Sequence, residues 1–568
     1  MSSLSRRTKP FVLLIGLALI AAACGSSGGR EGSSASTTTA TTAPVAVPTG
    51  GTLTVGAEQE PDCADWMGSC GGSSWGYWMM QVGTMPRAFD VVKVNGVYEN
   101  VPNSMLDGEP TLTTTPQQVV TYKINPKAVW NDGKPITSTD FKYTWQQVTT
   151  GSDIYDKTGY DKIESVDDSD PATAVVTFKK GETYPDWKAL FGGGYGIFPS
   201  HILQGKDRDK EMKDGYKFSA GPWVIDSWNK TDSITLVPND KFWGTKPKLD
   251  KVVFKFQADT SAEFSAFKSD QVSVIYPQPQ LDAVDQINAG LPNSDKKINT
   301  ETGNFEAIWI NNSKAPFTDP AVRQALAYSI DRTALVKRLF GGLGVTKPLN
   351  VLNAPIVKAY SDTEAFAKYT LDKTKADGLL TGAGWAKGAD GIYAKGGKKL
   401  TFTIRSTAGN KRRELTEQAL QQQLKTAGFD MKIQNAEAGD LFGDILPKGD
   451  FDAGIYAQVL TSLTPSNCSL FCSKNIPTSA NQFSGQNWTR TNVAPLDKQL
   501  EIIDSNLDEN ARMAAGKAAD GIMADSVVSL PIDPLPNILL FSTKVVGPID
   551  DNAVLGPFWN INEWGVKN

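Results

Sequence analysis

The segment FEAIWI, residues 305–310, decides the fold of this chain. Its β-branched and aromatic residues alternate with others, which predicts a strand. A turn follows, in which Asp319 is suited to cap a helix and Pro320 to be its first residue, because the first amides of a helix need an acceptor. Asp331 is suited to cap a second helix that ends at Gly341. The segment therefore predicts a strand followed by two short amphipathic helices.

The longer string WINNSKAPFTDPAVRQALAYSIDR, residues 309–332, resembles the central motif of the family 5 extracellular solute-binding proteins. These are the peptide, nickel and oligosaccharide receptors of ABC importers. Further motifs resemble the family in the family's order, at residues 128–145, 220–244 and 558–564. The resemblance implies a mixed α/β fold of the type II periplasmic-binding-protein kind, with two lobes and a ligand cleft between them.

The length of 568 residues excludes a single core, so at least two domains are expected. The export signal described below is predicted at residues 1–23 and a Ser/Thr-rich flexible tether at 24–49, where the composition cannot bury a core. The family resemblance then implies a first lobe at 50–303, a second lobe at 304–540, and a return to the first lobe at 541–568.

The charge balance narrows the choice of partners. The 57 basic and 62 acidic residues give a net charge of −5 without basic runs, which argues against nucleic acid. A single histidine, His201, limits metal and acid–base chemistry, and a structural role is expected for it. We expect no cofactor, no resident metal and a monomer.

The amino end is typical of an exported bacterial lipoprotein. Arg6, Arg7 and Lys9 precede a run of apolar residues at 11–20, which is too short to span a bilayer comfortably. Small residues at 21–23 then precede Cys24, as in a lipobox. Lipidation of Cys24 would anchor the protein to the outer face of the cytoplasmic membrane, in the periplasm or cell envelope. The alternative is ordinary cleavage at the same small residues, without a lipid.

The remaining cysteines are expected to pair. With Cys24 lipidated, Cys63, Cys70, Cys468 and Cys472 are left, and four cysteines allow three pairings. Export permits disulfides, and the two local bridges are the simplest scheme. A zinc site built from all four cysteines is the alternative.

The candidate ligand site rests on two segments. The aromatic residues after the first strand follow neither helix nor strand periodicity, so they form either a core-packing loop or a wall of the cleft. The resemblance favours the cleft, and it also implies an acidic residue there, at the position of Glu58. The second segment follows the strand-like residues 451–458. The predicted ligand contacts are Glu58, Trp66, Trp75, Tyr77, Trp78, Tyr456, Gln458 and Trp488.

One departure from the family pattern concerns the ligand. Peptide-binding members typically carry an aspartate after the second segment, which holds the amino terminus of the peptide. Residues 460–465 of this chain, LTSLTP, contain no carboxylate. A peptide ammonium would therefore lose that ion pair, which puts ordinary peptides in doubt and leaves sugars, modified peptides and other apolar-faced solutes.

The expected function is capture of a peptide-like or other small organic solute and its delivery to an ABC importer permease. An extracytoplasmic hydrolase is one alternative, but the sequence has no Gly-x-Ser-x-Gly element, and a catalytic triad could only use His201. A hydrolase that uses a pair of carboxylates, as glycosidases do, is still compatible with the sequence. A structural or signalling lipoprotein is the other alternative. Neighbouring permease and ATPase genes would favour transport, and turnover of the ligand would favour an enzyme.

Overall fold

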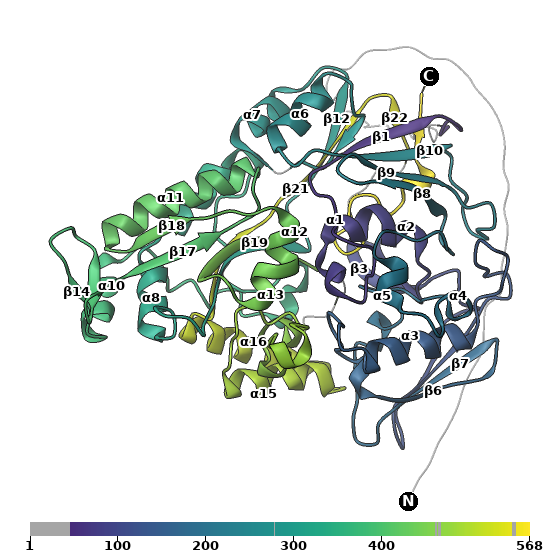
Figure 1. Cartoon of the computed structure of the whole chain (residues 1–568), viewed down its shortest axis with the longest axis horizontal. Helices are drawn as coiled ribbons and strands as arrows, with labels where there is room; N and C mark the ends of the chain where they lie inside the picture. The colour runs from purple at the N-terminus through teal and green to yellow at the C-terminus, as the bar shows by residue number, and fades with distance from the viewer. Residues whose placement is uncertain (1–45, 278, 461–462, 464–466, 548–551, 568) are drawn as a thin grey trace, which may run out of the picture. The chain divides into compact units, whose positions relative to one another are not determined.

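The computed structural model describes residues 46–277, 279–460, 463, 467–547 and 552–567, and residues 45–568 form one compact unit (Figure 1). The predicted export signal, Cys24 and most of the tether lie outside the described residues. Among the described helices, none has the length and apolar character that crossing a bilayer would require.

A seven-stranded sheet contains strands from both ends of the described chain. Its order is β12-β21-β11-β1-β10-β9-β8. The bounds are Thr52–Ala57 for β1, Trp223–Asn229 for β8, Ser233–Pro238 for β9, Lys251–Phe256 for β10, Val274–Ile275 for β11, Ser294–Asn299 for β12 and Asn537–Ser542 for β21. β1 is parallel to β10 and β11, while β21 is antiparallel to β11 and β12. The predicted boundary at residue 541 therefore falls inside β21.

A five-stranded sheet is built around the strand predicted at residues 305–310. Its order is β18-β17-β19-β13-β20. The bounds are Asn304–Ile310 for β13, Thr401–Arg405 for β17, Asp430–Ile433 for β18, Ala453–Val459 for β19 and Ser529–Pro534 for β20. β17 is parallel to β18 and β19, and β13 is antiparallel to β19 and β20. Every residue of β13 is buried, so the predicted strand is confirmed as a central one.

The two helices predicted after this strand are confirmed. They are α8 at Pro320–Tyr328 and α9 at Arg332–Phe340. The carboxylate of Asp319 accepts from the backbone N–H of Ala321 at 2.9 Å, and that of Asp331 accepts from Ala334 at 2.9 Å. The two predicted helix caps are therefore confirmed.

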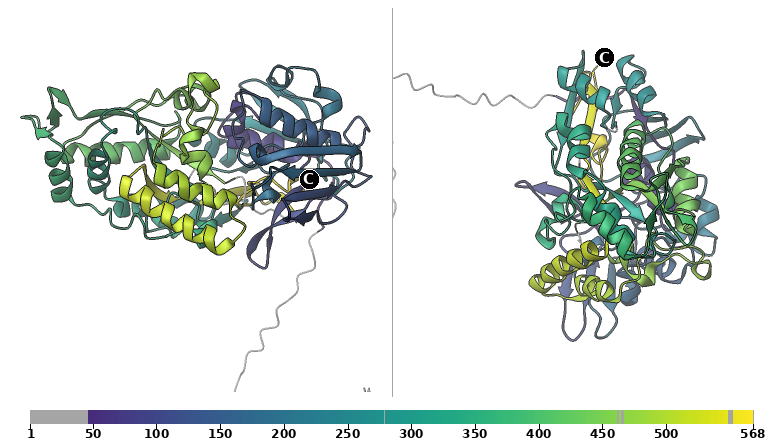
Figure 2. Two further views of the ribbon diagram at one scale, coloured as in Figure 1. Left: turned by 90° about the horizontal axis from the view of Figure 1, so that it is seen from below. Right: turned by 90° about the vertical axis from the view of Figure 1, so that its left-hand side faces the viewer.

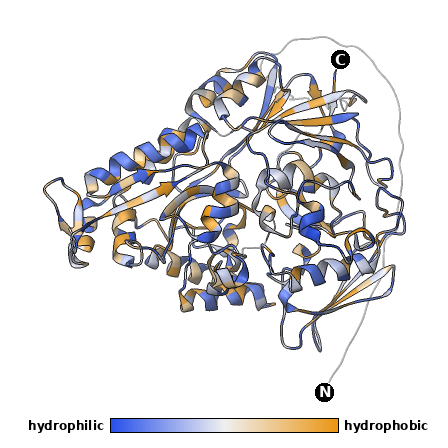
Figure 3. Cartoon of the chain, in the orientation of Figure 1, coloured by the Kyte–Doolittle hydropathy of each residue, from blue (hydrophilic) through white to orange (hydrophobic). Residues whose placement is uncertain are grey.

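Longer helices share a hydrophobic core with the five-stranded sheet, and Figures 1 and 2 show α15 and α16 side by side. The bounds are Lys373–Gly382 for α10, Lys411–Ala427 for α11, Ala494–Ser505 for α15 and Glu509–Ser526 for α16. α11 packs beside β18, and Figure 3 shows it largely hydrophilic while the central strands are hydrophobic. Gly428 ends α11 with φ +92°, a left-handed conformation that suits glycine.

A smaller sheet with one long helix completes the amino-terminal part. Its order is β4-β5-β7-β6, with bounds Thr111–Thr113 for β4, Val119–Lys123 for β5, Ile163–Asp170 for β6 and Thr173–Phe178 for β7. α3, Ser138–Thr150, packs on it and begins with a capping box between Thr137 and Asp140. Gly133 in the preceding turn has φ +85°, a conformation that glycine adopts readily in turns.

The remaining elements are short. The helices are Ser74–Gly76 for α1, Val82–Thr84 for α2, Ser200–Leu203 for α4, Arg208–Met212 for α5, Thr260–Lys268 for α6, Leu281–Ala289 for α7, Ala438–Asp440 for α12, Leu446–Lys448 for α13 and Cys468–Phe471 for α14. The strands are Phe89–Val94 for β2, Val97–Pro102 for β3, Ala386–Lys387 for β14, Tyr393–Lys395 for β15, Lys398–Lys399 for β16, Val545–Val546 for β22 and Gly565–Val566 for β23.

The buried apolar side chains fall into two clusters. The first core contains Leu53, Trp130 and Trp564, and the second core contains Phe305 and Leu420. The closing aromatic motif is docked in the first core, where Trp564 is 0% exposed. The chain therefore returns to the first core after building the second.

The aromatic segment after β1 differs from the prediction. It is helical from α1 through a π-helical turn at Tyr77–Gln81 into α2, instead of an irregular loop. Trp75, Tyr77 and Trp78 are buried, and so are the two methionines that follow them. A helix that is apolar on all sides shows no amphipathic period, which explains why the sequence did not reveal it.

The four cysteines among the described residues lie in two local pairs. Cys63 and Cys70 lie at disulfide distance with their Cα atoms 5.5 Å apart, and Cys468 and Cys472 do so with their Cα atoms 4.6 Å apart. Because each pair is joined within its own segment, these positions do not bring four thiols together for a zinc ion.

A buried ionic cluster joins β13 to α11. The Glu306 carboxylate accepts hydrogen bonds from Arg412 at 2.6 and 2.7 Å and from Arg413 at 2.6 Å. Burial by itself would raise the pKa of Glu306, but the two guanidinium groups outweigh it and lower that pKa to about 2. Asp533, opposite Glu306 on β20, is buried without a hydrogen-bond partner among the described residues. Burial and the charge of Glu306 hold the pKa of Asp533 well above its usual range.

The carboxyl group of Asp520 on α16 makes stability depend on pH. Burial raises the pKa of Asp520 to about 7, although the hydrogen bond from the Asp362 N–H at 2.8 Å acts in the opposite direction. The folded protein therefore holds this proton more tightly than the unfolded chain. The resulting stability is fully present below about pH 4 and is lost as pH rises toward about 7.

We predict that Asp520→Asn removes this pH-dependent loss of stability. Urea unfolding measures the free energy of unfolding at pH 5 and at pH 8. The decrease from pH 5 to pH 8 should be smaller in the variant than in the parent protein, by on the order of 3 kcal/mol. Asp525→Asn, which changes an exposed carboxylate of the same helix, is the control. An identical decline in Asp520→Asn and the parent protein would contradict the assignment.

Candidate functional site

A cavity of about 260 Å³ lies where segments of the two cores meet. Its lining is drawn from many parts of the chain: residues within 71–78, 155–160, 184–195, 276–279, 303–305, 456–460, 467–470, 486–488 and 535–537, among others. Trp75, Trp78 and Tyr160 of the lining belong to the first core, while Tyr456 and Trp488 belong to the second. Both cores therefore contribute to this site.

One wall of the cavity is an aromatic cluster of the first core. The Trp75 and Trp78 rings lie 5.6 Å apart edge to face, and Trp78 lies 5.5 Å from Tyr276 in the same geometry. Trp75 also lies 6.1 Å from Phe558, so the carboxyl-terminal motif supports this wall from behind. The rings fix one another in place and leave little freedom to be lost when a ligand binds.

The other wall is an aromatic cluster of the second core. Tyr456 lies 5.8 Å from Trp488 edge to face, and Phe442 lies 6.2 Å from Trp488. Tyr456 stacks on Trp309 of β13 at 5.1 Å, which ties this wall to the central strand. Tyr155 bridges the two sides, with its ring 6.4 Å from that of Trp488.

Among the described residues, the lining contains buried polar groups without partners and two charged side chains. Tyr77 Oη, Trp78 Nε1 and Trp488 Nε1 are buried without a hydrogen-bond partner among the described residues. Indole N–H groups can only donate, so a ligand that brings acceptors would satisfy them. The charged side chains among the described lining residues are Asp156 and Arg413, and Arg413 is already paired with Glu306.

The structure brings together six of the eight predicted contact residues, but not Glu58 or Trp66. The six that line the cavity are Trp75, Tyr77, Trp78, Tyr456, Gln458 and Trp488. Trp66 lies in the first core, 1% exposed, and donates to Tyr216 Oη at 2.9 Å. Glu58 is buried, its charge raises the pKa of Glu263 on α6, and it is not among the described residues that line the cavity. Contact of these two residues with a ligand stays a prediction.

Sequence reasoning missed much of the lining. Tyr155, Asp156, Tyr195 and Phe442 all line the cavity, and none was predicted. The first two belong to a loop after α3 with no repeating pattern, and Tyr195 follows a run of glycines. Only the amino-acid composition could have pointed to these residues, since tyrosines are frequent between residues 155 and 195.

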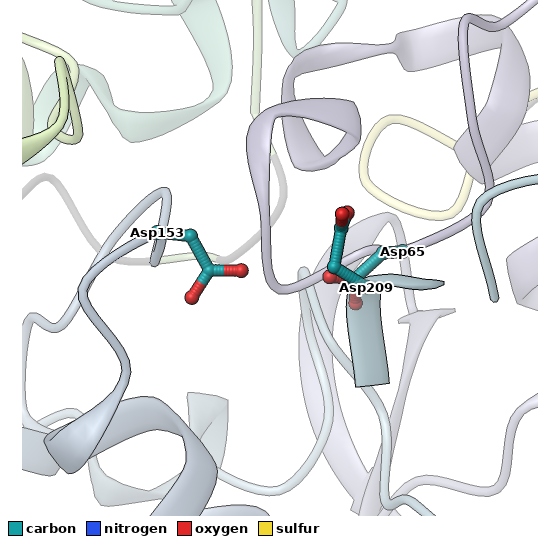
Figure 4. Close-up of side chains that lie close together, drawn as sticks. All are labelled: Asp65, Asp153 and Asp209. Atoms are coloured by element: carbon teal, nitrogen blue, oxygen red, sulfur yellow. The ribbon is translucent and has the colours of Figure 1, made fainter. Parts of the chain in front are cut away.

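Three carboxylates that could suggest a metal site lie elsewhere. Asp65, Asp153 and Asp209 approach one another within 4.8 Å, and Figure 4 shows them converging from three segments. The guanidinium of Arg208 lies among them, 2.8 Å from Asp65 and 2.5 Å from Asp153. Because Arg208 supplies the opposite charge and the hydrogen bonds, we assign this group as an ion-pair network.

The single histidine also has a partner outside the cavity. Nε2 of His201 lies 2.9 Å from an Asp132 oxygen in the turn before α3. His201 is not among the described residues that line the cavity. This contact agrees with the structural role expected for it.

Comparison with known proteins identifies the family. The family described as "Bacterial extracellular solute-binding proteins, family 5 Middle" matches residues 110–475. The chain belongs to this family. Family 5 proteins are solute-binding proteins, in agreement with the resemblance of the central motif.

Family 5 relatives include named oligopeptide-binding proteins. The chain is 25% identical over 469 residues to the oligopeptide-binding protein OppA of Mycobacterium tuberculosis, which covers 80% of this chain and 75% of that protein. It is 27% identical over 396 residues to the oligopeptide-binding protein AppA of Bacillus subtilis, covering 68% of this chain and 70% of that protein.

Solved structures of family 5 proteins share the fold. AppA from Bacillus subtilis in complex with a nonapeptide matches with a TM-score of 0.80 and 22% identity, covering 92% of this chain and 100% of that one. The periplasmic EDTA-binding protein EppA matches with a TM-score of 0.78 and 23% identity, and the match covers 92% of this chain and 97% of that one. The predicted two-lobed α/β fold is therefore confirmed.

We predict that Arg208→Met lowers the free energy of unfolding by about 3–5 kcal/mol, because it leaves the buried Asp65 carboxylate without its partner. Chemical denaturation measures the effect, and adding Asp65→Asn to the variant should recover part of the loss. Lys206→Met, which breaks an exposed ion pair with Glu211, should cost less than about 1 kcal/mol. Stabilisation of the parent protein by calcium at this group would contradict the ion-pair assignment.

Proposed function

We propose that this protein captures a peptide-like or other small organic solute outside the cytoplasm and delivers it to the permease of an ABC importer. The observation that carries the proposal is the aromatic cavity, to which both cores contribute a wall. Membership of family 5 and the similarity to oligopeptide-binding proteins support the same function. Binding between two parts of a chain lets ligand capture change the arrangement of those parts, which a permease can recognise.

The size of the cavity favours a small solute. Ligand pockets usually measure about 300–1,000 Å³, and this cavity, at about 260 Å³, lies just below that range. AppA was solved with a nonapeptide. We therefore infer that the solute bound in this arrangement is much shorter than nine residues.

Contacts beside the cavity hold its two sides together. Ser484 Oγ donates to the carbonyl of Ile154, and Lys162 Nζ donates to the carbonyl of Asp504. Thr183 Oγ1 donates similarly to a carbonyl at the end of α15. These contacts are few and polar, and water can replace each of them. We infer that their rupture opens the cavity for ligand entry.

A lipid on Cys24 would keep the protein at the outer face of the cytoplasmic membrane. The support is in the sequence: a short apolar run, small residues, the cysteine and a tether to residue 49. One lipid chain alone binds a membrane reversibly, so more than one acyl chain on this cysteine is expected for stable anchoring. The tether would let the folded unit reach a permease beside it.

Ligand binding is tested by native mass spectrometry of the purified protein, which should reveal a co-purified solute. Trp488→Ala should weaken binding of that solute by about 1–3 kcal/mol, because an aromatic face of the cavity is lost. Trp385→Ala removes an indole outside the lining and should leave affinity unchanged. If both variants stay folded by thermal melting and Trp488→Ala binds normally, the cavity is not the binding site.

Anchoring is tested by Cys24→Ala. We expect this change to move the protein from the membrane fraction to the soluble or secreted fraction, because the lipid attachment point is lost. Detergent-phase partitioning of the mature protein and its variant gives the readout. A variant that stays in the detergent phase would contradict lipidation at Cys24.

A further inference from the structure

Asp156 is the one carboxylate among the described residues that line the cavity. One of its oxygens accepts from the backbone N–H of Thr158 at 2.9 Å, and the other accepts from Gln486 Nε2 at 3.3 Å. Its own backbone N–H donates to Tyr195 Oη at 2.6 Å. The loop and the carboxylate are therefore held in one orientation, with Thr158, Gln486 and Tyr195 also lining the cavity.

The charge of this carboxylate is not compensated within the described residues. Arg413, the other charged lining residue, is paired with Glu306 at 2.6 Å, whereas the ion pairs among the described residues do not include Asp156. Lys474 acts on it only as a more distant charge. Asp156 is half-buried, and removal of its carboxyl from water raises its pKa above the usual range. A positive group placed beside it would offset this desolvation.

Aromatic residues adjoin Asp156. Tyr155 precedes Asp156 in the chain, and its ring lies 6.4 Å from Trp488. Tyr195 contacts the Asp156 backbone and lies 6.1 Å from Tyr160. Ring faces attract organic cations, and a carboxylate among them adds a charge-assisted hydrogen bond. A metal ion would need several oxygen ligands, and the described lining offers one carboxylate.

We propose that Asp156 binds a positively charged group of the solute, an ammonium or a guanidinium. This inference rests on the proposed function, since it assumes that the cavity is the ligand site. Gln486 contacts the same carboxylate and lies two residues before Trp488 of the second core. A cation held at Asp156 would therefore sit where the two cores meet, in contact with residues of both.

The test uses two probes that differ only at their amino terminus. They are L-phenylalanyl-L-alaninamide, which carries an ammonium, and its N-acetylated form, which is neutral. Calorimetric titration of the ligand-free protein should show the cationic probe binding about tenfold or more tightly than the neutral one. Asp156→Asn keeps the shape and one acceptor, and should bring the two affinities within about twofold of each other.

Asp161→Asn is the matched control, because it removes a nearby carboxylate that acts on Asp156 but does not line the cavity. It should keep the preference for the cationic probe. Equal binding of the two probes by the parent protein, or a preference that persists in Asp156→Asn, would overturn the assignment. If a protein with a co-purified solute binds neither probe, the cation assignment fails while the proposed function stands. Absence of any solute from the native protein would count against the proposed function instead.

Discussion

The ion pair between Glu306 and the two arginines of α11 is the constraint on which the second core depends. β13 is buried along its whole length, so an acidic side chain there must be compensated inside the protein. Arg412 and Arg413 supply five-donor guanidinium groups that reach it from α11, with bond lengths of 2.6 to 2.7 Å. The helix is thereby fixed on the sheet, and Arg413 is brought to the edge of the cavity.

From this central strand the structure extends to both walls of the cavity. Trp309 on β13 stacks on Tyr456, and Tyr456 packs against Trp488, so one wall is a continuation of the second core. The opposite wall rests on the first core through Trp75 and Phe558. Each wall packs within its own core, while a few polar contacts and the ring contact between Tyr155 and Trp488 join the two walls. Two well-packed walls joined by few contacts are suited to a receptor that closes on its ligand.

The charge pattern of the cavity gives the site its chemical character. Two other buried carboxylates are neutralised by arginines: Glu306 by Arg412 and Arg413, and Asp65 by Arg208. Asp156 differs because it meets a backbone amide and a glutamine instead of a cation. Residues 460–465 also lack a carboxylate. Recognition of a positive group by this chain would therefore depend on a loop of the first core.

The sequence by itself determined the features that depend on neighbouring residues. Asp319 and Asp331 cap their helices because a capping side chain reaches amides two or three residues away, and the local cysteine pairs follow from their short spacing. The tertiary structure alone decided which aromatic side chains face the cavity. Trp66 and Trp75 belong to one aromatic segment, yet the first packs into a core and the second lines the cavity. That difference is set by contacts with residues distant in the chain, such as Tyr216 and Phe558, which no local pattern records.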